Sequence, residues 1–208
     1  MEITDEKNYL KALRFKLDSY SPLIDTTWDE LEQIVQFIIL TKDELLLGNG
    51  YVSPNMYFVC KGSLRAFYTD LHGDIYTKNI FVENNIAGSL ASTIQRKPSE
   101  FTLESLENDT ILIALNYTKF RKLIEKHADL KNCYISYLEQ HWIIEKEKRE
   151  ISLVMEDGID RYQKFLDLHP NIEKRISLHH IASHLGITST QFSRIRKKMK
   201  DISKNQHM

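Results

Sequence analysis

The stretch ISLHHIASHLGITSTQFSRIRKKM, Ile176–Met199, decides the fold of this chain. Ser177 can cap a short helix whose apolar residues recur at helical spacing, and Gly186 provides its left-handed end. Thr188 and Gln191 stand three residues apart as a capping-box pair, so a second helix is predicted to begin one turn later. Two short helices that meet at a sharp corner are typical of a helix-turn-helix.

The second predicted helix has one apolar face and one polar face. The apolar face is formed by Phe192, Ile195 and Met199. The polar face carries hydroxyl groups and cations, which belong to Thr190, Ser193, Arg194 and Lys197. A helix of this layout is suited to the major groove of DNA, so we expect the segment to bind DNA.

The distribution of charge favours the same interpretation. The net charge is −1, but residues 158–208 hold 10 Lys and Arg against 4 Asp and Glu, which leaves 18 against 25 in the first 157 residues. The second helix carries several cations that suit phosphate groups, namely Arg194, Arg196, Lys197, Lys198 and Lys200. Cations at the end of a helix also stabilise the helix dipole, so charge by itself does not decide the function.

Composition indicates a globular chain of one large or two modest domains. Of 208 residues, 42% are hydrophobic and 27% are charged. No stretch approaches the roughly 20 apolar residues of a membrane span, and the first residues lack the apolar core of a signal peptide, so we expect a cytoplasmic protein without a membrane partner. Cys60 and Cys133 lie far apart in sequence, so we expect two reduced thiols, no metal and no cofactor.

The first half of the chain has the pattern of helices followed by strands. Two helices are predicted, Tyr9 to Leu17 and Thr27 to Ile38. From Leu45 to about Leu115 the pattern changes to short strands, with turns at Lys61-Gly62 and in LHGD. Repeated short strands favour an antiparallel jelly-roll barrel. Its alternating positions include Tyr57, Val59, Leu64, Ala66, Tyr68, Ile80 and Val82.

A long helix is predicted between the strands and the basic segment. Its main apolar seam alternates between spacings of four and three, and consists of Leu130, Tyr134, Tyr137, His141, Ile144, Lys148, Ile151 and Met155. A second stripe lies beside it, formed by Ile135, Leu138 and Trp142. A helix with two apolar stripes needs two partners, so we expect it to pack on its own barrel and on the same helix of a second subunit.

These elements divide the chain into three parts and give an α+β fold. Residues 1–116 form the expected β-barrel sensor-like domain with its N-terminal helices, residues 117–157 the long connecting and dimerisation helix, and residues 158–208 the helix-turn-helix domain. Histidines are common in the last part, and His180 and His184 stand four residues apart. No carboxylate ligand pattern accompanies them, so solvated helix faces explain them better than a metal site.

In this order of parts, the chain resembles the Crp/Fnr superfamily of bacterial transcription regulators. The resemblance covers nearly the whole chain and depends on three stretches: Leu45–Asp74, the GSL of Gly88 to Leu90, and Ile181–Met199. It implies a jelly-roll domain of the cyclic-nucleotide-binding type, a dimer across the long helix and a winged helix-turn-helix that reads a palindromic duplex. RNA polymerase is a further candidate partner.

The resemblance also implies a phosphate cassette, and this sequence departs from it. Family members that bind cyclic nucleotides have Gly-Glu-Leu, with an arginine eleven residues after the glycine. Here Gly88 and Leu90 are kept, but Ser89 replaces the glutamate and Ser99 the arginine. The glutamate accepts a ribose hydroxyl and the arginine neutralises the phosphate, so the usual binding of cyclic AMP is not expected. The four residues stand as a degenerate ligand site with an unidentified effector.

On the recognition helix, the base-reading positions that the resemblance implies fall on Ser189, Thr190 and Arg194. Arg194 is the best candidate for a bidentate contact to guanine. Gln191 and Ser193 can add polar or phosphate contacts, although the capping box can occupy Gln191. Lys197 and Lys198 fit phosphate contacts, which position a protein on DNA without specifying the sequence.

The expected function is therefore a homodimeric, sequence-specific transcription regulator and not an enzyme. A metalloenzyme of the cupin type would need several histidines inside the barrel, and the first 116 residues contain one, His72. Two alternatives remain open. One is a protein-interaction module that uses the helix-turn-helix without DNA, and the other is a regulator that binds a different small anion in the barrel.

Overall fold

The computed structural model describes residues 5–205 and divides the chain into two compact units. The first unit combines Met1–Ala66 with Ile80–Glu145, and the second combines Phe67–Asn79 with Lys146–Met208. The second unit therefore contains a β hairpin taken from the strand region as well as the C-terminal helices. No helix in the described part of the chain is long and apolar enough to cross a membrane.

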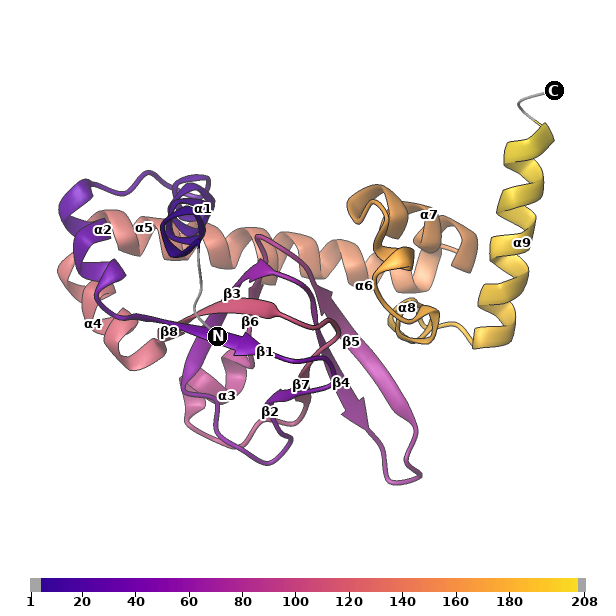
Figure 1. Cartoon of the computed structure of the whole chain (residues 1–208), viewed down its shortest axis with the longest axis horizontal. Helices are drawn as coiled ribbons and strands as arrows, with labels where there is room; N and C mark the ends of the chain where they lie inside the picture. Colours follow the sequence, from indigo (N-terminus) through magenta and orange to yellow (C-terminus); the bar gives the residue numbers. More distant parts are fainter. Residues whose placement is uncertain (1–4, 206–208) are drawn as a thin grey trace. The chain divides into compact units, whose positions relative to one another are not determined.

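The described residues contain two four-stranded sheets (Figure 1). The first has the order β1-β8-β3-β6, and its strands are β1 (Val35–Leu40), β8 (Thr110–Asn116), β3 (Asn55–Lys61) and β6 (Ile86–Ala87). The second has the order β2-β7-β4-β5, and its strands are β2 (Leu45–Leu47), β7 (Thr102–Ser105), β4 (Leu64–Thr69) and β5 (Ile75–Phe81). No pairing joins the two sheets within residues 5–205, so the predicted barrel is a jelly-roll-like sandwich that does not close. The predicted α+β fold is confirmed.

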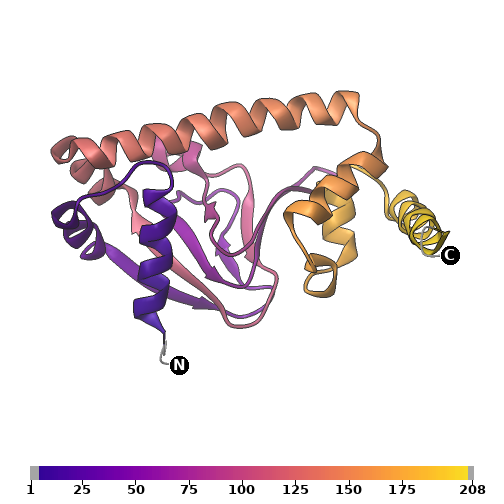
Figure 2. The same cartoon turned by 90° about the horizontal axis from the view of Figure 1, so that it is seen from above.

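Helices gather at one end of the strands of the first unit (Figure 2). They are α1 (Glu6–Asp18), α2 (Asp25–Glu32), α4 (Tyr117–Lys126) and α5 (Ala128–Leu138), while the short α3 (Leu90–Gln95) follows β6. The largest side chains of their common core are fully buried, and include Leu13, Leu31, Phe58, Ile113 and Leu130. This core fixes the helices on β3 and β8.

The prediction of a helix from Thr27 to Ile38 is correct only in its first part. The helix α2 ends at Glu32, and Val35–Leu40 forms β1, which pairs antiparallel with β8 from Val35↔Leu115 to Leu40↔Thr110. The sequence VQFIIL is rich in β-branched and aromatic residues, which pack well on a sheet. Residues 35–38, which the helical spacing assigns to the end of the helix, therefore belong to the sheet.

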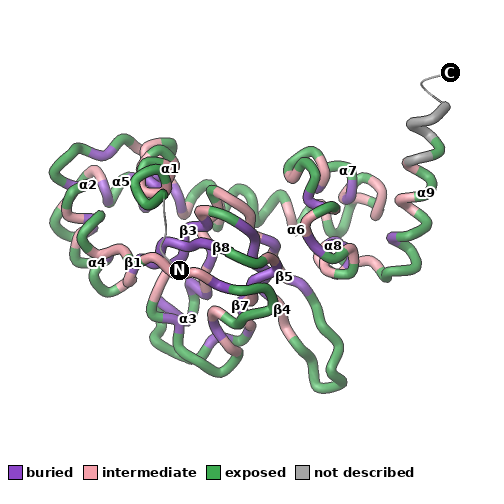
Figure 3. The backbone as a smooth tube through the Cα atoms, viewed as in Figure 1, coloured by how far each residue is buried: buried purple, intermediate pink, exposed green. Residues whose placement is uncertain are grey.

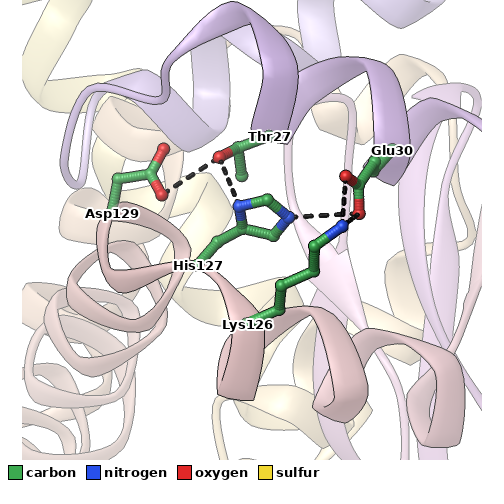
Figure 4. Close-up of polar contacts among 5 residues, drawn as sticks. All are labelled: Thr27, Glu30, Lys126, His127 and Asp129. Atoms are coloured by element: carbon green, nitrogen blue, oxygen red, sulfur yellow. Dashed lines mark hydrogen bonds and ion pairs between the residues drawn. The ribbon is translucent and has the colours of Figure 1, made fainter.

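A polar cluster joins α2 to the junction of α4 and α5 (Figure 4). The Thr27 side chain is fully buried, and its hydroxyl lies 3.1 Å from His127 Nδ1 and 3.1 Å from Asp129 Oδ1. His127 Nε2 lies 3.1 Å from Glu30 Oε2, and Lys126 Nζ lies 2.5 Å from Glu30 Oε1. The contacts with Lys126 and His127 hold the pKa of Glu30 below its ordinary value. The cluster therefore links three helices, and its role is structural.

The predicted long helix is interrupted by a π-helical turn. After α5 the chain forms η1 (Glu139–Ile144) and then α6 (Glu145–Met155). A π-helical turn holds one extra residue, so side chains after it are rotated by about 100° relative to a continuous α-helical pattern. Leu130, Tyr134 and Tyr137 are buried, whereas the later seam residues are exposed, namely Ile144, Lys148, Ile151 and Met155. The π-helical turn interrupts the predicted seam, and packing of its exposed part on a second subunit stays a prediction.

The second unit contains α7 (Gly158–Leu168), the 3₁₀ turn η2 (Ile172–Lys174), α8 (Leu178–His184) and α9 (Ser189–Asn205). Within residues 5–205, no strand follows β8, and α9 continues to Asn205. The wing that the resemblance implied is therefore absent from this part of the chain.

The hairpin of the second unit is bonded directly to α8. Thr77 N donates to Ser183 Oγ at 2.8 Å, and Ser183 Oγ donates to Ile75 O at 3.2 Å. Arg149 of α6 donates to Asn79 Oδ1 at 2.7 Å. These bonds tie residues 75–77 to the first helix of the helix-turn-helix and Asn79 to α6.

His184 lies at the same contact and is kept neutral. Its ring is 5.6 Å from the ring of Phe165, and its Nδ1 is 3.4 Å from Arg149 Nη2. Burial lowers the pKa of His184 to about 3, and the charge of Arg149 acts in the same direction. The ring of His169 also packs on Phe165, and burial lowers the pKa of His169.

The pKa of His184 predicts an acid-sensitive second unit. In the unfolded chain the imidazole takes up a proton near its ordinary pKa of about 6.5, whereas the folded unit resists it. The free energy of unfolding should therefore fall as the pH drops below about 6.5. Urea unfolding on both sides of that pH should show a smaller fall for His184→Gln than for the wild type and for His179→Gln, an exposed control. Equal falls in all three proteins would contradict the assignment.

Two turn glycines provide a matched test of the sandwich. Gly62 and Gly73 share a φ of +87°, but a Cβ on Gly62 would lie 2.4 Å from Thr110 Oγ1, whereas none of the described atoms lies within 4 Å of a Cβ on Gly73. Gly73→Ala should cost about 1 kcal/mol from backbone strain alone. Gly62→Ala should cost about 1–3 kcal/mol more, because β8 must move. Urea denaturation measures both, and equal losses would show that the contact with Thr110 is unimportant.

Candidate nucleic-acid interface

The corner between α8 and α9 forms as the sequence predicts (Figure 1). Ser177 Oγ accepts a hydrogen bond from His179 N at 3.3 Å and caps α8. Gly186 has a φ of +68°, which ends α8 in the left-handed conformation. The chain needs only Leu185–Thr188 to pass from one helix to the other. The prediction of a helix-turn-helix corner is confirmed.

A reciprocal capping box begins α9. Thr188 N donates to Gln191 Oε1 at 3.0 Å, and Gln191 N donates to Thr188 Oγ1 at 3.2 Å. The Thr188 hydroxyl also lies 3.1 Å from Gln191 Oε1. These bonds satisfy backbone donors that a helix start would leave unpaired, so the direction of α9 is fixed at its first turn.

The apolar side of α9 packs on α7. Phe192 is 3% exposed, and its ring meets the ring of Tyr162 edge to face, with centroids 4.8 Å apart. A Cβ on Gly158 would lie 3.0 Å from Ile195 Cδ1, so the first residue of α7 must be small for this close approach. Met199 is half-buried. The apolar face predicted for α9 is confirmed.

An ion pair next to this core holds the middle of α9. Arg196 Nε donates to Glu173 Oε1 at 2.7 Å, and the Arg196 guanidinium lies 6.0 Å from the centre of the Phe192 ring. The Tyr162 hydroxyl also donates to Glu173. Burial and the charge of Glu173 raise the pKa of Tyr162 to about 12, so the phenol keeps the proton that it donates. Sequence reasoning had counted Arg196 among the phosphate-binding cations.

The residues predicted to contact DNA are exposed, and Figure 3 draws much of the described part of α9 in the colour of exposed residues. All seven are exposed, namely Ser189, Thr190, Gln191, Ser193, Arg194, Lys197 and Lys198. Thr190, Ser193, Arg194 and Lys197 follow helical spacing and form one face. Backbone hydrogen bonds from Asp160 and Ile159 lower the pKa of Asp157, the cap of α7, and the charge of Lys198 acts in the same direction. Contact of these residues with DNA stays a prediction.

His179 is a residue of this surface that sequence reasoning did not select. Its Nδ1 lies 3.3 Å from Ser189 Oγ, so the first exposed hydroxyl of α9 is turned toward α8. The signal available in the sequence was the position of His179 in the first turn of α8, two residues after the cap Ser177. The contacts of α8 with Thr77 and Ile75 had no such signal, because those residues are more than 100 positions away.

The degenerate ligand site lies in the first unit and is closed by its own hydrogen bonds. Ser89 and Ser99, at the positions of the glutamate and the arginine, are each 2% exposed, and their hydroxyls lie 3.0 Å apart. Ser99 Oγ also lies 2.8 Å from Phe101 O. Gly88 has a φ of +155° and its Cβ position is close to Asn55 O, while Leu90 belongs to the core.

Two more buried residues complete this serine cluster. Ser92 Oγ accepts from Ser53 N at 3.0 Å and donates to Lys97 O at 2.5 Å, and Thr93 Oγ1 donates to Ser89 O at 2.9 Å. The side chains of Arg96 and Lys97 are exposed. Each of the hydroxyls named here is paired with the chain itself. Because the cluster consists of serines and a threonine, it offers no cation and no carboxylate to a cyclic nucleotide.

Comparisons with known proteins find similar folds but no similar sequence family. No protein-family model matches the sequence, and no curated protein matches it. Among solved structures, the chain is similar to FixK2 from Bradyrhizobium japonicum, with 16% identity and a TM-score of 0.67 over 82% of this chain and 86% of FixK2. It is also similar to the Thermus thermophilus catabolite activator protein, with 18% identity and a TM-score of 0.54 over 90% of this chain and 88% of that protein.

A third similar structure is CLP of Xanthomonas campestris, described as a c-di-GMP-responsive global regulator. It shares 14% identity and a TM-score of 0.64, over 86% of this chain and 93% of CLP. At these identities the similarity concerns the fold. Together with the sandwich of the first unit and the capped corner of the second, it confirms the fold expected from the resemblance to the Crp/Fnr superfamily, apart from the wing, which the described residues lack.

Proposed function

We propose that the chain is a homodimeric, sequence-specific DNA-binding transcription regulator that uses α9 as its recognition helix. The observation that carries the proposal is the exposed face of Thr190, Ser193, Arg194 and Lys197, on a helix whose start is fixed by a capping box. Hydroxyls and cations on one face of a firmly held helix match what the major groove offers, which is base edges between two rows of phosphates. The fold shared with CLP and the catabolite activator protein supports this use.

The second subunit of the proposed dimer covers the exposed apolar side chains of the long helical segment. Large apolar residues remain exposed in the last turn of α5, in η1 and in α6, and include Ile135, Trp142, Ile143, Ile144, Ile151, Leu153, Val154 and Met155. Apolar side chains in such number on one segment mark a protein contact more often than a solvated surface. Two copies present two recognition helices, which suits a palindromic duplex.

The first unit acts in this proposal without a cyclic nucleotide. Recognition of a phosphate and a ribose needs a cation and a carboxylate at fixed positions. Ser89 and Ser99 stand at these two positions and carry no charge. Their hydroxyls bond to each other and to the chain. Cyclic AMP is therefore not expected to bind in the usual manner, and the effector is unidentified.

Binding to DNA is tested by removing one cation at a time from α9. Arg194→Ala should cost about 1–3 kcal/mol of binding and relax the preference for one sequence. Lys197→Ala should weaken binding to all sequences alike and make the slope of log K against log salt shallower by about 1. Lys42→Ala, a control in an exposed loop of the first unit, should change neither quantity.

Electrophoretic mobility shift at two salt concentrations measures both effects. If neither variant of α9 alters the binding of DNA, the recognition helix has been assigned wrongly. If the protein binds a protein partner and its association is insensitive to salt, the helix-turn-helix serves as an interaction module instead.

Thermal unfolding tests the loss of the nucleotide site. Because a ligand of the folded state raises Tm by mass action, cyclic AMP at about 1 mM should leave Tm unchanged if the serine cluster cannot hold it. The double variant Ser89→Glu and Ser99→Arg introduces the two charged groups that the cluster lacks and serves as the comparison. A clear rise in the Tm of the wild type with cyclic AMP would contradict the proposed loss of the site.

A further inference from the structure

We propose that the hairpin formed by β4 and β5 inhibits DNA binding by occupying one side of α8, and that the chain releases this contact when it binds DNA. The hairpin contact consists of the bonds between residues 75–77 and Ser183, together with the bond from Arg149 to Asn79. The inference rests on the proposed function and deepens it, since it states how the same DNA-binding surface is regulated.

The side of α8 that the hairpin occupies adjoins the start of α9. Ser183 stands four residues after His179, and residues at that spacing lie on the same side of a helix. His179 Nδ1 in turn lies 3.3 Å from the hydroxyl of Ser189, the first residue of α9. His179, Ser183 and Ser189 therefore belong to one surface, and the hairpin occupies the end that contains Ser183.

This surface is the one that a bound duplex would approach. A recognition helix contacts base edges with its N-terminal residues, while the first helix of the motif crosses the DNA backbone. The peptide groups of Ile75 and Thr77 lie against Ser183, where the phosphates of that backbone would pass. The hairpin also carries two exposed carboxylates, Asp70 and Asp74, which repel phosphates. The hairpin contact therefore opposes the approach of DNA to α8.

Two features of the hairpin contact favour its release. Thr77 is fully buried, and its hydroxyl has no hydrogen-bond partner among the described residues. A buried hydroxyl without a partner makes the contact that buries it less stable. The second feature is that His184 Nδ1 lies 3.4 Å from Arg149 Nη2, so two basic side chains are held together. Release of the hairpin would open the surroundings of Thr77 to water and let the two basic groups separate.

The hairpin also continues into the sandwich through its own backbone. Leu64–Ala66 of β4 and Ile80–Phe81 of β5 belong to the first unit, whereas residues 67–79 belong to the second. A change in the pairing of these strands in the sandwich can therefore alter residues 75–77 through covalent bonds alone. The first unit thereby gains a means of controlling DNA binding by the second.

The effect on affinity follows from the population of the open state. If DNA binds only molecules whose hairpin contact is open, the apparent affinity is reduced to the fraction of molecules that are open. Ser183→Ala removes the acceptor of Thr77 N and leaves this buried donor unpaired in the closed state. Loss of that bond should shift the equilibrium about 5- to 150-fold toward the open state, and the affinity for DNA should rise by up to the same factor.

The experiment measures the affinity of the full-length protein for a duplex selected from a pool with a randomised segment of roughly 20 base pairs, enough for two half-sites. Ser183→Ala is compared with Asn79→Ala, which removes the acceptor of Arg149. Leu71→Ala is the control, because Leu71 is fully exposed in the turn of the hairpin. All three substitutions preserve the net charge, so a change in affinity does not come from a changed attraction to phosphates.

We expect Ser183→Ala to bind the duplex about 5- to 150-fold more tightly than the wild type, and Asn79→Ala about 2- to 12-fold more tightly. Leu71→Ala should bind like the wild type. Amide hydrogen exchange in the wild type provides a second readout that needs no variant. The amide of Thr77 should exchange faster in the complex with DNA than in the free protein, because it loses its bond to Ser183.

Either of two results overturns the inference. One is an affinity of both Ser183→Ala and Asn79→Ala that is equal to or lower than that of the wild type, which would mean that the hairpin contact does not oppose DNA binding. The other is exchange at Thr77 that is unchanged or slower in the complex. If the wild type and all three variants fail to bind any duplex in a salt-dependent manner, the proposed function itself is rejected, and the inference with it.

Discussion

The reciprocal hydrogen bonds between Thr188 and Gln191 are the interaction on which the account of this protein depends. They start α9, and so they fix which side chains of that helix turn inward and which stay exposed. Phe192 then enters the core against Tyr162, and Arg196 meets Glu173. The same bonds occupy the oxygen of Gln191. The contact that starts α9 thereby also occupies a polar group of the face proposed to contact DNA.

Self-pairing of polar groups has the same effect in the first unit. Ser89 and Ser99 occupy the two positions where the resembling family places charged nucleotide ligands, and each hydroxyl finds its partner within the chain. Buried polar groups must be paired, and here the backbone and neighbouring serines pair them without any ligand. In both units, therefore, hydrogen bonds that complete the fold occupy polar groups at the positions proposed to bind a ligand or DNA.

Much of the site could be predicted from the sequence because its determinants are local. The cap at Ser177, the left-handed Gly186 and the box of Thr188 and Gln191 each involve residues within three positions of one another, and all were confirmed. Features that depend on distant partners could not be predicted in this way. Val35–Leu40 became a strand because β8 pairs with it, and the bond from Thr77 to Ser183 joins segments that no local pattern connects. The π-helical turn η1 likewise had no signature in the apolar spacing.

Arg194 is the residue that we propose to read a guanine in the major groove. Methylation interference tests it most directly, because a methyl group on guanine N7 blocks the acceptor that an arginine fork uses. A selected duplex should lose binding when one guanine in each half-site is methylated, and methylation of other guanines should have little effect. The Arg194→Ala variant should lose this sensitivity. Binding that tolerates methylation at every guanine would contradict the account.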